Sequence, residues 1–125
     1  MALTHTDATR NAAVSAKLGR IDAGTTNANG QLEFLAADDS LICACDCANP
    51  AFGEPAAGVA TANAIAESSN GTGTIAIHRF VDRDGNEVFR GTVTATGGGG
   101  DIELSSVTLN DEPVRITSYT YTEGA

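Results

Sequence analysis

Three cysteines at alternate positions are the side chains of this sequence with the clearest potential for chemistry. Cys43, Cys45 and Cys47 occur in the run SerLeuIleCysAlaCysAspCys, residues 40–47, which alternates with a period of two. Side chains two residues apart on a β-strand point to the same face, so the three thiols are predicted to share one face. Thiols in such a row can bind a metal ion, form disulfides or fill a core as small apolar groups.

Three interpretations of this row are open, of which burial in the core is favoured. Zinc requires four ligands, and neither His5 nor His78 stands at the spacing of a zinc finger. Positions i and i+2 on a straight strand are about 6.5–7 Å apart at Cα, which is at the limit for a disulfide within the row. Because the number of cysteines is odd, a disulfide to another chain or to a distant element is a further alternative.

Oxygen-bearing side chains in AspArgAspGlyAsn, residues 82–86, are spaced as in the opening of a calcium-binding loop. The twelfth position of such a loop carries a glutamate, and here it is Val93. Two β-rich runs flank the segment, and an Asp-Gly pair between two such runs is typical of a β-hairpin turn. A hairpin turn is therefore predicted in place of a calcium site, and no metal or other cofactor is expected.

Neither histidine belongs to a recognisable catalytic pattern. Nucleophilic catalysis requires a serine or cysteine with a positioned base; His5 stands near the N-terminus and His78 on a predicted strand. We expect His78 to be a surface side chain paired with a neighbour. The four glycines at 97–100 precede Asp101 and a strand rather than a lysine and a helix, so they do not indicate a phosphate-binding loop. The chain is predicted not to be an enzyme.

The elements that would position these residues are one helix and about seven short strands. Residues 7–22 predict a helix, with Thr6 or Asp7 as the N-cap and Gly24 as the stop. Period-two alternation, β-rich composition and intervening turn residues predict the strands. Their ranges are 31–36, 40–47, 59–66, 74–81, 87–93, 102–109 and 114–122.

The strand pattern predicts a mainly β fold, an antiparallel β-sandwich or barrel with one N-terminal α-helix. The 125 residues are expected to form a single domain. Residues 1–24 would form an N-terminal arm and helix, and residues 31–122 the β domain. Residues 48–73, rich in Ala, Gly, Pro, Asn and Ser, are expected to form a long loop around the short strand 59–66.

Composition and charge exclude several classes of partner. Sixteen acidic residues stand against seven basic ones, for a net charge of −9, so binding to nucleic acid is not expected. No run of about 18 apolar residues predicts a membrane span, and the N-terminus lacks the pattern of a secretory signal. Core material is scarce, because 21 residues are Ala and only 25 are Val, Ile, Leu or Phe. An acidic, soluble domain with a thin core is expected.

Several short motifs together resemble a family of small virion structural proteins from tailed phages and prophages. The N-terminal ThrHisThrAspAlaThrArgAsnAlaAlaVal is similar to the opening helix of the family, and GlyValAlaThrAlaAsnAlaIle, residues 58–65, is the most distinctive match. The other similar segments, which extend over nearly the whole chain, are 22–24, 32–34, 49–53, 84–86, 88–93, 102–106 and 114–122.

The resemblance implies a capsid decoration, or cement, protein that binds the outer surface of a phage head and stabilises the junctions between capsomers. The implied partners are the major capsid protein and further copies of the same chain, as a homotrimer or another small cyclic oligomer. The implied location is the virion, after synthesis in the host cytoplasm. Where the relatives alternate Leu and Thr, this chain carries Cys43, Cys45 and Cys47, which favours buried thiols and leaves room for cross-linking between chains.

Contacts with the shell are expected from loop 48–73 and the N-terminal arm, because loops and termini carry recognition on a rigid scaffold. Phe52 and Ile65 are candidate apolar anchors, and Tyr119 and Tyr121 are candidate interface residues. One alternative is a tail-tube, connector or fibre-associated structural protein. An alternative from another class is a carbohydrate- or cell-surface-binding module, which would present exposed aromatic side chains such as these two tyrosines.

Overall fold

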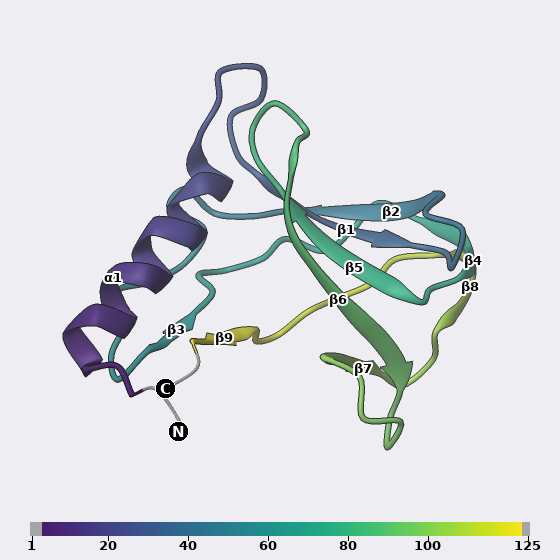
Figure 1. The fold of residues 1–125 in the computed structure, drawn as a ribbon. Helices are drawn as coiled ribbons and strands as arrows, with labels where there is room; N and C mark the ends of the chain where they lie inside the picture. The colour runs from purple at the N-terminus through teal and green to yellow at the C-terminus, as the bar shows by residue number, and fades with distance from the viewer. Residues whose placement is uncertain (1–3, 124–125) are drawn as a thin grey trace.

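The computed structural model describes residues 4–123, in which one α-helix precedes nine β-strands (Figure 1). The helix, α1 (Asp7–Leu18), continues directly into a 3-10 turn (Gly19–Asp22). The strands are β1 (Gln31–Leu35), β2 (Leu41–Asp46), β3 (Val59–Thr61), β4 (Gly71–Thr74), β5 (Ile77–Val81), β6 (Glu87–Ala95), β7 (Ile102–Leu104), β8 (Thr108–Glu112) and β9 (Thr120–Thr122). The prediction of a mainly β fold with one N-terminal helix is confirmed, with nine strands rather than about seven.

Local chemistry at both ends explains where α1 begins and ends. The Thr6 hydroxyl accepts a hydrogen bond from the Thr9 amide (3.2 Å), which satisfies one of the free N–H groups of the first turn. Gly19 takes the C-cap position, and the chain tightens into the 3-10 turn that ends at Asp22. The predicted helical range 7–22 is confirmed, with its last turn in the tighter form. No helix within residues 4–123 has the length and apolar character needed to cross a membrane.

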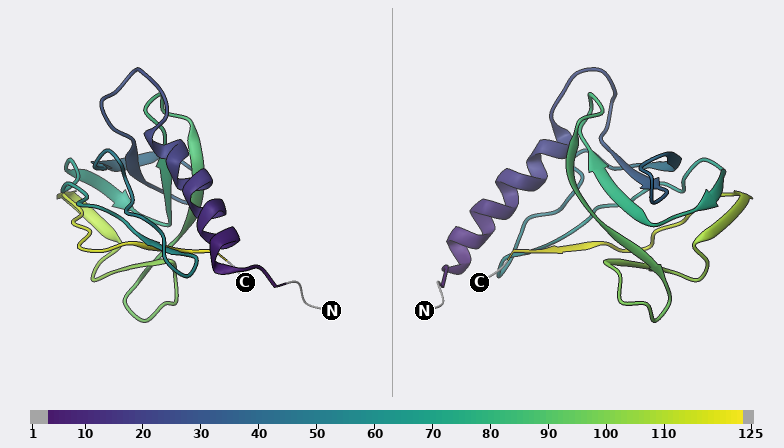
Figure 2. Two further views of the ribbon diagram at one scale, coloured as in Figure 1. Left: turned by 90° about the vertical axis from the view of Figure 1, so that its left-hand side faces the viewer. Right: turned by 45° about the vertical axis from the view of Figure 1, so that its right-hand side comes forward.

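A five-stranded sheet in the order β2-β1-β5-β6-β7 forms the main layer. Alternate residues of its central strands, among them Leu32, Phe34 and Phe80, point to one side and are buried. Val14 and Ile21 reach the same buried cluster from the helical segment, so α1 lies along one side of the strands (Figure 2). The core therefore lies between the helix, the main sheet and the strands that return across it.

Two smaller sheets, β3-β9 and β4-β8, complete the curled, half-barrel arrangement of the strands (Figure 1). Strand pairs within residues 4–123 are antiparallel except for β6 and β7, which run parallel over residues 93–95 and 102–104. The prediction of antiparallel pairing is wrong at this place. The glycine-rich turn permits it, because Gly97 and Gly99 adopt positive φ angles of 89° and 81° that other residues rarely adopt.

Two of the predicted strands are each divided between two sheets. Within 74–81, the Ile75 amide donates to the Val107 carbonyl (2.8 Å), whereas the Ala76 amide donates to the last residue of β1 (2.9 Å). These two neighbouring residues therefore pair with different segments. The chain passes from the β4-β8 sheet to the main sheet between the end of β4 and the start of β5. The predicted strand 102–109 is divided in the same way into β7 and β8.

Two other predicted strands are shorter than expected. Of the range 59–66 only β3 is a strand, and of the range 114–122 only β9. These two pieces pair with each other, with Ala60 opposite Tyr121. The segment 48–73, expected to be a long loop around one short strand, contains that strand as β3 and also the start of β4, so it contributes to both small sheets.

The first turns of α1 and the end of β9 lie side by side at one end of the molecule (Figure 1). The Arg10 guanidinium donates to the Glu123 carbonyl at 3.0 Å, and the Lys17 ammonium lies 2.7 Å from the Glu123 carboxylate. The Glu123 amide in turn donates to the Gly58 carbonyl (2.8 Å). The helix therefore holds the last strand in place against β3.

Candidate functional site

A groove of about 360 Å³ separates β7 from the segment that connects β8 to β9. Residues 101–104 form one wall and residues 115–120 the other. Figure 1 shows this second wall as the yellow segment that leads into β9. The exposed side chains of Asp101, Glu103 and Arg115 bring two acids and one base to the groove.

The backbone of the second wall is held only at its two ends. The Val114 carbonyl accepts a hydrogen bond from the Ser68 amide (2.9 Å), and the Tyr119 carbonyl accepts one from the Ala62 amide (2.8 Å). Within the described part of the chain, residues 115–118 make no backbone hydrogen bond with another segment. Four consecutive residues of a β-patterned segment therefore keep their amides and carbonyls free.

A second groove, of about 350 Å³, continues the first along β9 toward β6. The two share Asp101, Tyr119 and Thr120, and the second adds the half-buried rings of Phe89 and Tyr121. These two rings lie 5.3 Å apart between centroids, at 59° to each other. The candidate interface residues Tyr119 and Tyr121 are thus brought together at this groove.

Beneath the junction of the two grooves lies a fully buried histidine. His78 of β5 has no exposed surface, so the expectation of a surface side chain is wrong. Its Nε2 atom lies 3.0 Å from the Tyr119 hydroxyl, and the two rings meet edge to face at 5.4 Å. Burial lowers the pKa of His78, and burial also raises the pKa of Tyr119 to about 12. The pair is therefore uncharged at neutral pH.

A glycine allows this cluster to close. A Cβ atom at Gly91 would stand 2.6 Å from the imidazole Cε1 of His78 and 2.7 Å from the Asp101 carboxylate, so only glycine fits. Asp101 accepts hydrogen bonds from the Thr92 amide (2.9 Å) and the Thr92 hydroxyl (3.1 Å). The backbone bond is the main reason that the pKa of Asp101 lies below its usual value. The carboxylate is thus fixed and ionised at the groove.

The three cysteines lie on the buried face of the second strand and its end, as the favoured interpretation predicted. Cys43, Cys45 and Cys47 are free thiols with at most 3% of their surface exposed. Burial raises the pKa of all three, to about 12 for Cys45 and Cys47. Within residues 4–123 no cluster of His, Cys, Asp and Glu side chains could hold a metal ion.

The two candidate apolar anchors lie against the core. Phe52 is only 7% exposed and packs at 5.5 Å against the ring of Phe80 and at 6.0 Å against that of Tyr119. Its side chain is therefore mainly part of the core, which corrects the expectation of an exposed anchor, and it also lines a pocket of about 170 Å³ beside α1. Ile65 is half-buried and packs on the outside of the same cluster.

The segment 82–86 forms the predicted hairpin turn between β5 and β6. The Asp82 carboxylate accepts hydrogen bonds from the amides of Asp84 and Asn86, each at 2.9 Å, and Gly85 has a φ of 86°. The Asp84 carboxylate accepts two more, from the amides of Thr25 and its neighbour. These carboxylates are thus occupied by backbone amides, and they tie the hairpin to the turn before β1.

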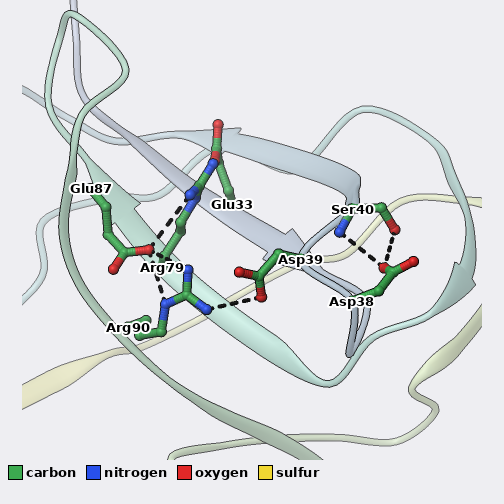
Figure 3. A network of polar contacts seen from close by, with 7 residues as sticks. All are labelled: Glu33, Asp38, Asp39, Ser40, Arg79, Glu87 and Arg90. Atoms are coloured by element: carbon green, nitrogen blue, oxygen red, sulfur yellow. Dashed lines mark hydrogen bonds and ion pairs between the residues drawn. The ribbon is translucent and has the colours of Figure 1, made fainter.

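A chain of ion pairs crosses the outer face of the main sheet (Figure 3). Arg79 of β5 lies 2.7 Å from Glu33 and 3.5 Å from Glu87, and Arg90 of β6 lies 2.7 Å from Glu87 and 3.0 Å from Asp39. The hydrogen bond from Arg90 is the main reason that the pKa of Glu87 is lowered. On this face the acidic and basic side chains are paired with one another. In the first groove, by contrast, neither Glu103 nor Arg115 makes an ion pair within residues 4–123.

Comparisons with protein-family models, curated proteins and solved structures found no match to this chain. Within residues 4–123 the groove with the unpaired wall is the feature best suited to binding a macromolecule.

Proposed function

We propose that this chain is a phage virion structural protein that binds the outer surface of the head as a decoration, or cement, protein. The observation that carries the proposal is the groove beside residues 115–118, which is lined by exposed charged side chains and by a segment whose backbone groups make no hydrogen bond within residues 4–123. Such a surface is suited to binding another protein. The motif resemblance supports the assignment to a phage head.

The partners in this proposal are the major capsid protein and further copies of the chain, as a homotrimer or another small cyclic oligomer. Capsids offer threefold and quasi-threefold sites, and cyclic symmetry is the usual arrangement of identical subunits. The thin core supports such an arrangement, because a domain with only 25 Val, Ile, Leu and Phe residues gains stability from any partner that binds its folded state.

The proposal is tested by mixing purified protein with undecorated heads and sedimenting the particles. We expect the protein to pellet with the heads in a saturable manner and to raise the temperature at which the shell falls apart. Heads alone and heads with heat-unfolded protein serve as controls. If the protein stays in the supernatant and leaves the shell temperature unchanged, the decoration role is wrong. Pelleting with isolated tails instead would assign it to the tail.

A further inference from the structure

The first wall of the groove ends the main sheet and has an unpaired edge. In a parallel ladder, successive residues direct their backbone groups alternately to one side and to the other. The Leu104 carbonyl accepts from the Thr96 amide at 3.0 Å, on the side of β6. The N–H and C=O groups of Glu103 therefore point away from β6 and into the groove, where no partner strand exists within residues 4–123.

The second wall keeps the character of a strand without belonging to a sheet. Its sequence alternates, with Val114 buried, Ile116 half-buried and the intervening Arg115 and Thr117 exposed. Three of its six residues, Ile116, Thr117 and Thr120, are β-branched, and such residues favour strands. This segment has the sequence pattern of a strand but no strand partner. In natural proteins, such disagreements between sequence pattern and structure are concentrated at functional sites.

We propose that an extended segment of a partner protein binds in this groove as an added β-strand, hydrogen-bonded to residues 115–118 and flanked by β7. Strand addition to an exposed sheet edge is an established mode of peptide recognition, in which the backbone supplies affinity and alternate side chains supply specificity. The inference deepens the proposed function and rests on it, because the partner is then a segment of the shell protein.

Charge indicates which kind of segment fits. Asp101 and Glu103 are held in the first wall by hydrogen bonds from backbone amides, at 2.9 Å from Thr92 and at 3.1 Å from Gly97. Arg115 is the only base opposite them in this groove. An extended segment that alternates apolar side chains with Lys or Arg complements these walls. A strand from a second copy is disfavoured in this acidic groove, because each chain carries a net charge of −9, so the copies of a cyclic oligomer would meet through another surface.

Hydrogen exchange of the free and head-bound protein tests the inference directly. We expect the amides of residues 115–118 to exchange rapidly in the free protein and to become protected when the protein is bound to undecorated heads. Binding without that protection would overturn the inference and leave the decoration role intact. Failure to bind at all would overturn both. Protection in concentrated protein without heads would assign the groove to a second copy and overturn the proposed occupant.

A pair of substitutions at one exposed position gives an independent test. Thr117→Pro removes one edge amide that makes no hydrogen bond within the described chain, whereas Thr117→Val keeps the amide and the strand preference. We expect Thr117→Pro to bind heads about tenfold more weakly, as for the loss of one backbone hydrogen bond. Thr117→Val should bind like the wild type, with both melting temperatures close to that of the wild type. Equal affinity of the two variants for heads would contradict strand addition.

Discussion

His78 makes the stability of the fold depend on pH near neutrality. Burial lowers its pKa below the 6.5 of an ordinary histidine, so the unfolded chain binds a proton more readily than the folded one. The stabilising contribution of the neutral ring is complete above pH 6.5 and is lost as the pH falls from there through the lowered pKa. The free energy of unfolding should therefore fall between pH 7.5 and 5.5, by at most about 1.4 kcal/mol per pH unit.

Thermal or urea unfolding of two matched variants would isolate this histidine. His78→Gln should flatten the dependence over that range, and His5→Gln, at the exposed histidine before α1, should leave it unchanged. The pKa values of Asp101, Glu87 and Glu123 are lowered from ordinary values of at most 4.5. These acids therefore stay ionised between pH 7.5 and 5.5. An equal slope in the wild type and His78→Gln would show that another group is responsible.

At the scale of elements, β2 buries its cysteines but begins at an exposed residue, Leu41, and thiol reactivity distinguishes these positions. A thiol with a pKa of about 12 is ionised in only about one molecule in ten thousand at pH 8. Cys45 and Cys47 should therefore react with Ellman's reagent only after unfolding in guanidinium chloride, and so should Cys43, which is also buried and whose pKa burial also raises. Leu41→Cys, on the same strand at a position that is 58% exposed, should react within seconds.

Electrophoresis of the same samples addresses cross-linking between chains. With all three thiols buried, the protein should run as a monomer with or without reductant. Dimer bands that vanish on reduction, or rapid labelling of the native wild type, would mean that the strand leaves the core.

Elements specified by local sequence were predictable, and those specified by distant pairing were not. The Thr6 cap and the Asp-Gly turn at 84–85 act within a few residues, so the helix and the β5–β6 hairpin could be predicted from the sequence. The exchange of partners at Ile75 and Ala76 depends on segments some 30 to 40 residues away, and no local pattern indicates it. The unpaired segment 115–118 has a strand-like sequence for the same reason: alternation predicts extended backbone and does not identify its partner.

The candidate site was only partly predictable. Tyr119 and Tyr121 stood out as the only tyrosines of the chain, and the structure brings them to one groove. His78 was misjudged because alternation in 74–81 cannot tell which face of a strand is covered. The residues that enclose His78 are Tyr119 and Gly91. Only the tertiary fold brings them to the histidine, so no local pattern indicated that it is buried. Phe52 was misjudged because its loop is exposed at Pro50 and Glu54 but turns this one ring inward, against Phe80.

For the whole molecule, we expect the net charge to oppose folding more than the ion pairs support it. The pairs of Arg90 on the outer sheet face are solvent-accessible, and such pairs contribute little, whereas the Arg79–Glu33 pair is part-buried. Repulsion at a net charge of −9 acts over the whole surface and is screened by salt. Raising NaCl from about 20 mM to 500 mM should therefore raise the melting temperature by a few degrees.

The double variant Glu54→Gln/Glu67→Gln is the matched comparison, since both side chains are exposed and make no ion pair within residues 4–123. It removes two negative charges and should be less sensitive to salt. A melting temperature that falls with salt would indicate that the ion pairs dominate.

The contact between α1 and β9 brings the beginning and the end of the described chain close together in space. Because the Arg10 guanidinium reaches the Glu123 carbonyl at 3.0 Å, a short Gly-Ser linker from Glu123 to Thr4 would span the gap. The chain could then be reopened in the exposed hairpin at Gly85, where the added ends would disturb little buried surface. Such a circular permutant would carry any fused cargo at the hairpin, at the opposite end of the molecule from the start of α1 and the end of β9 (Figure 1).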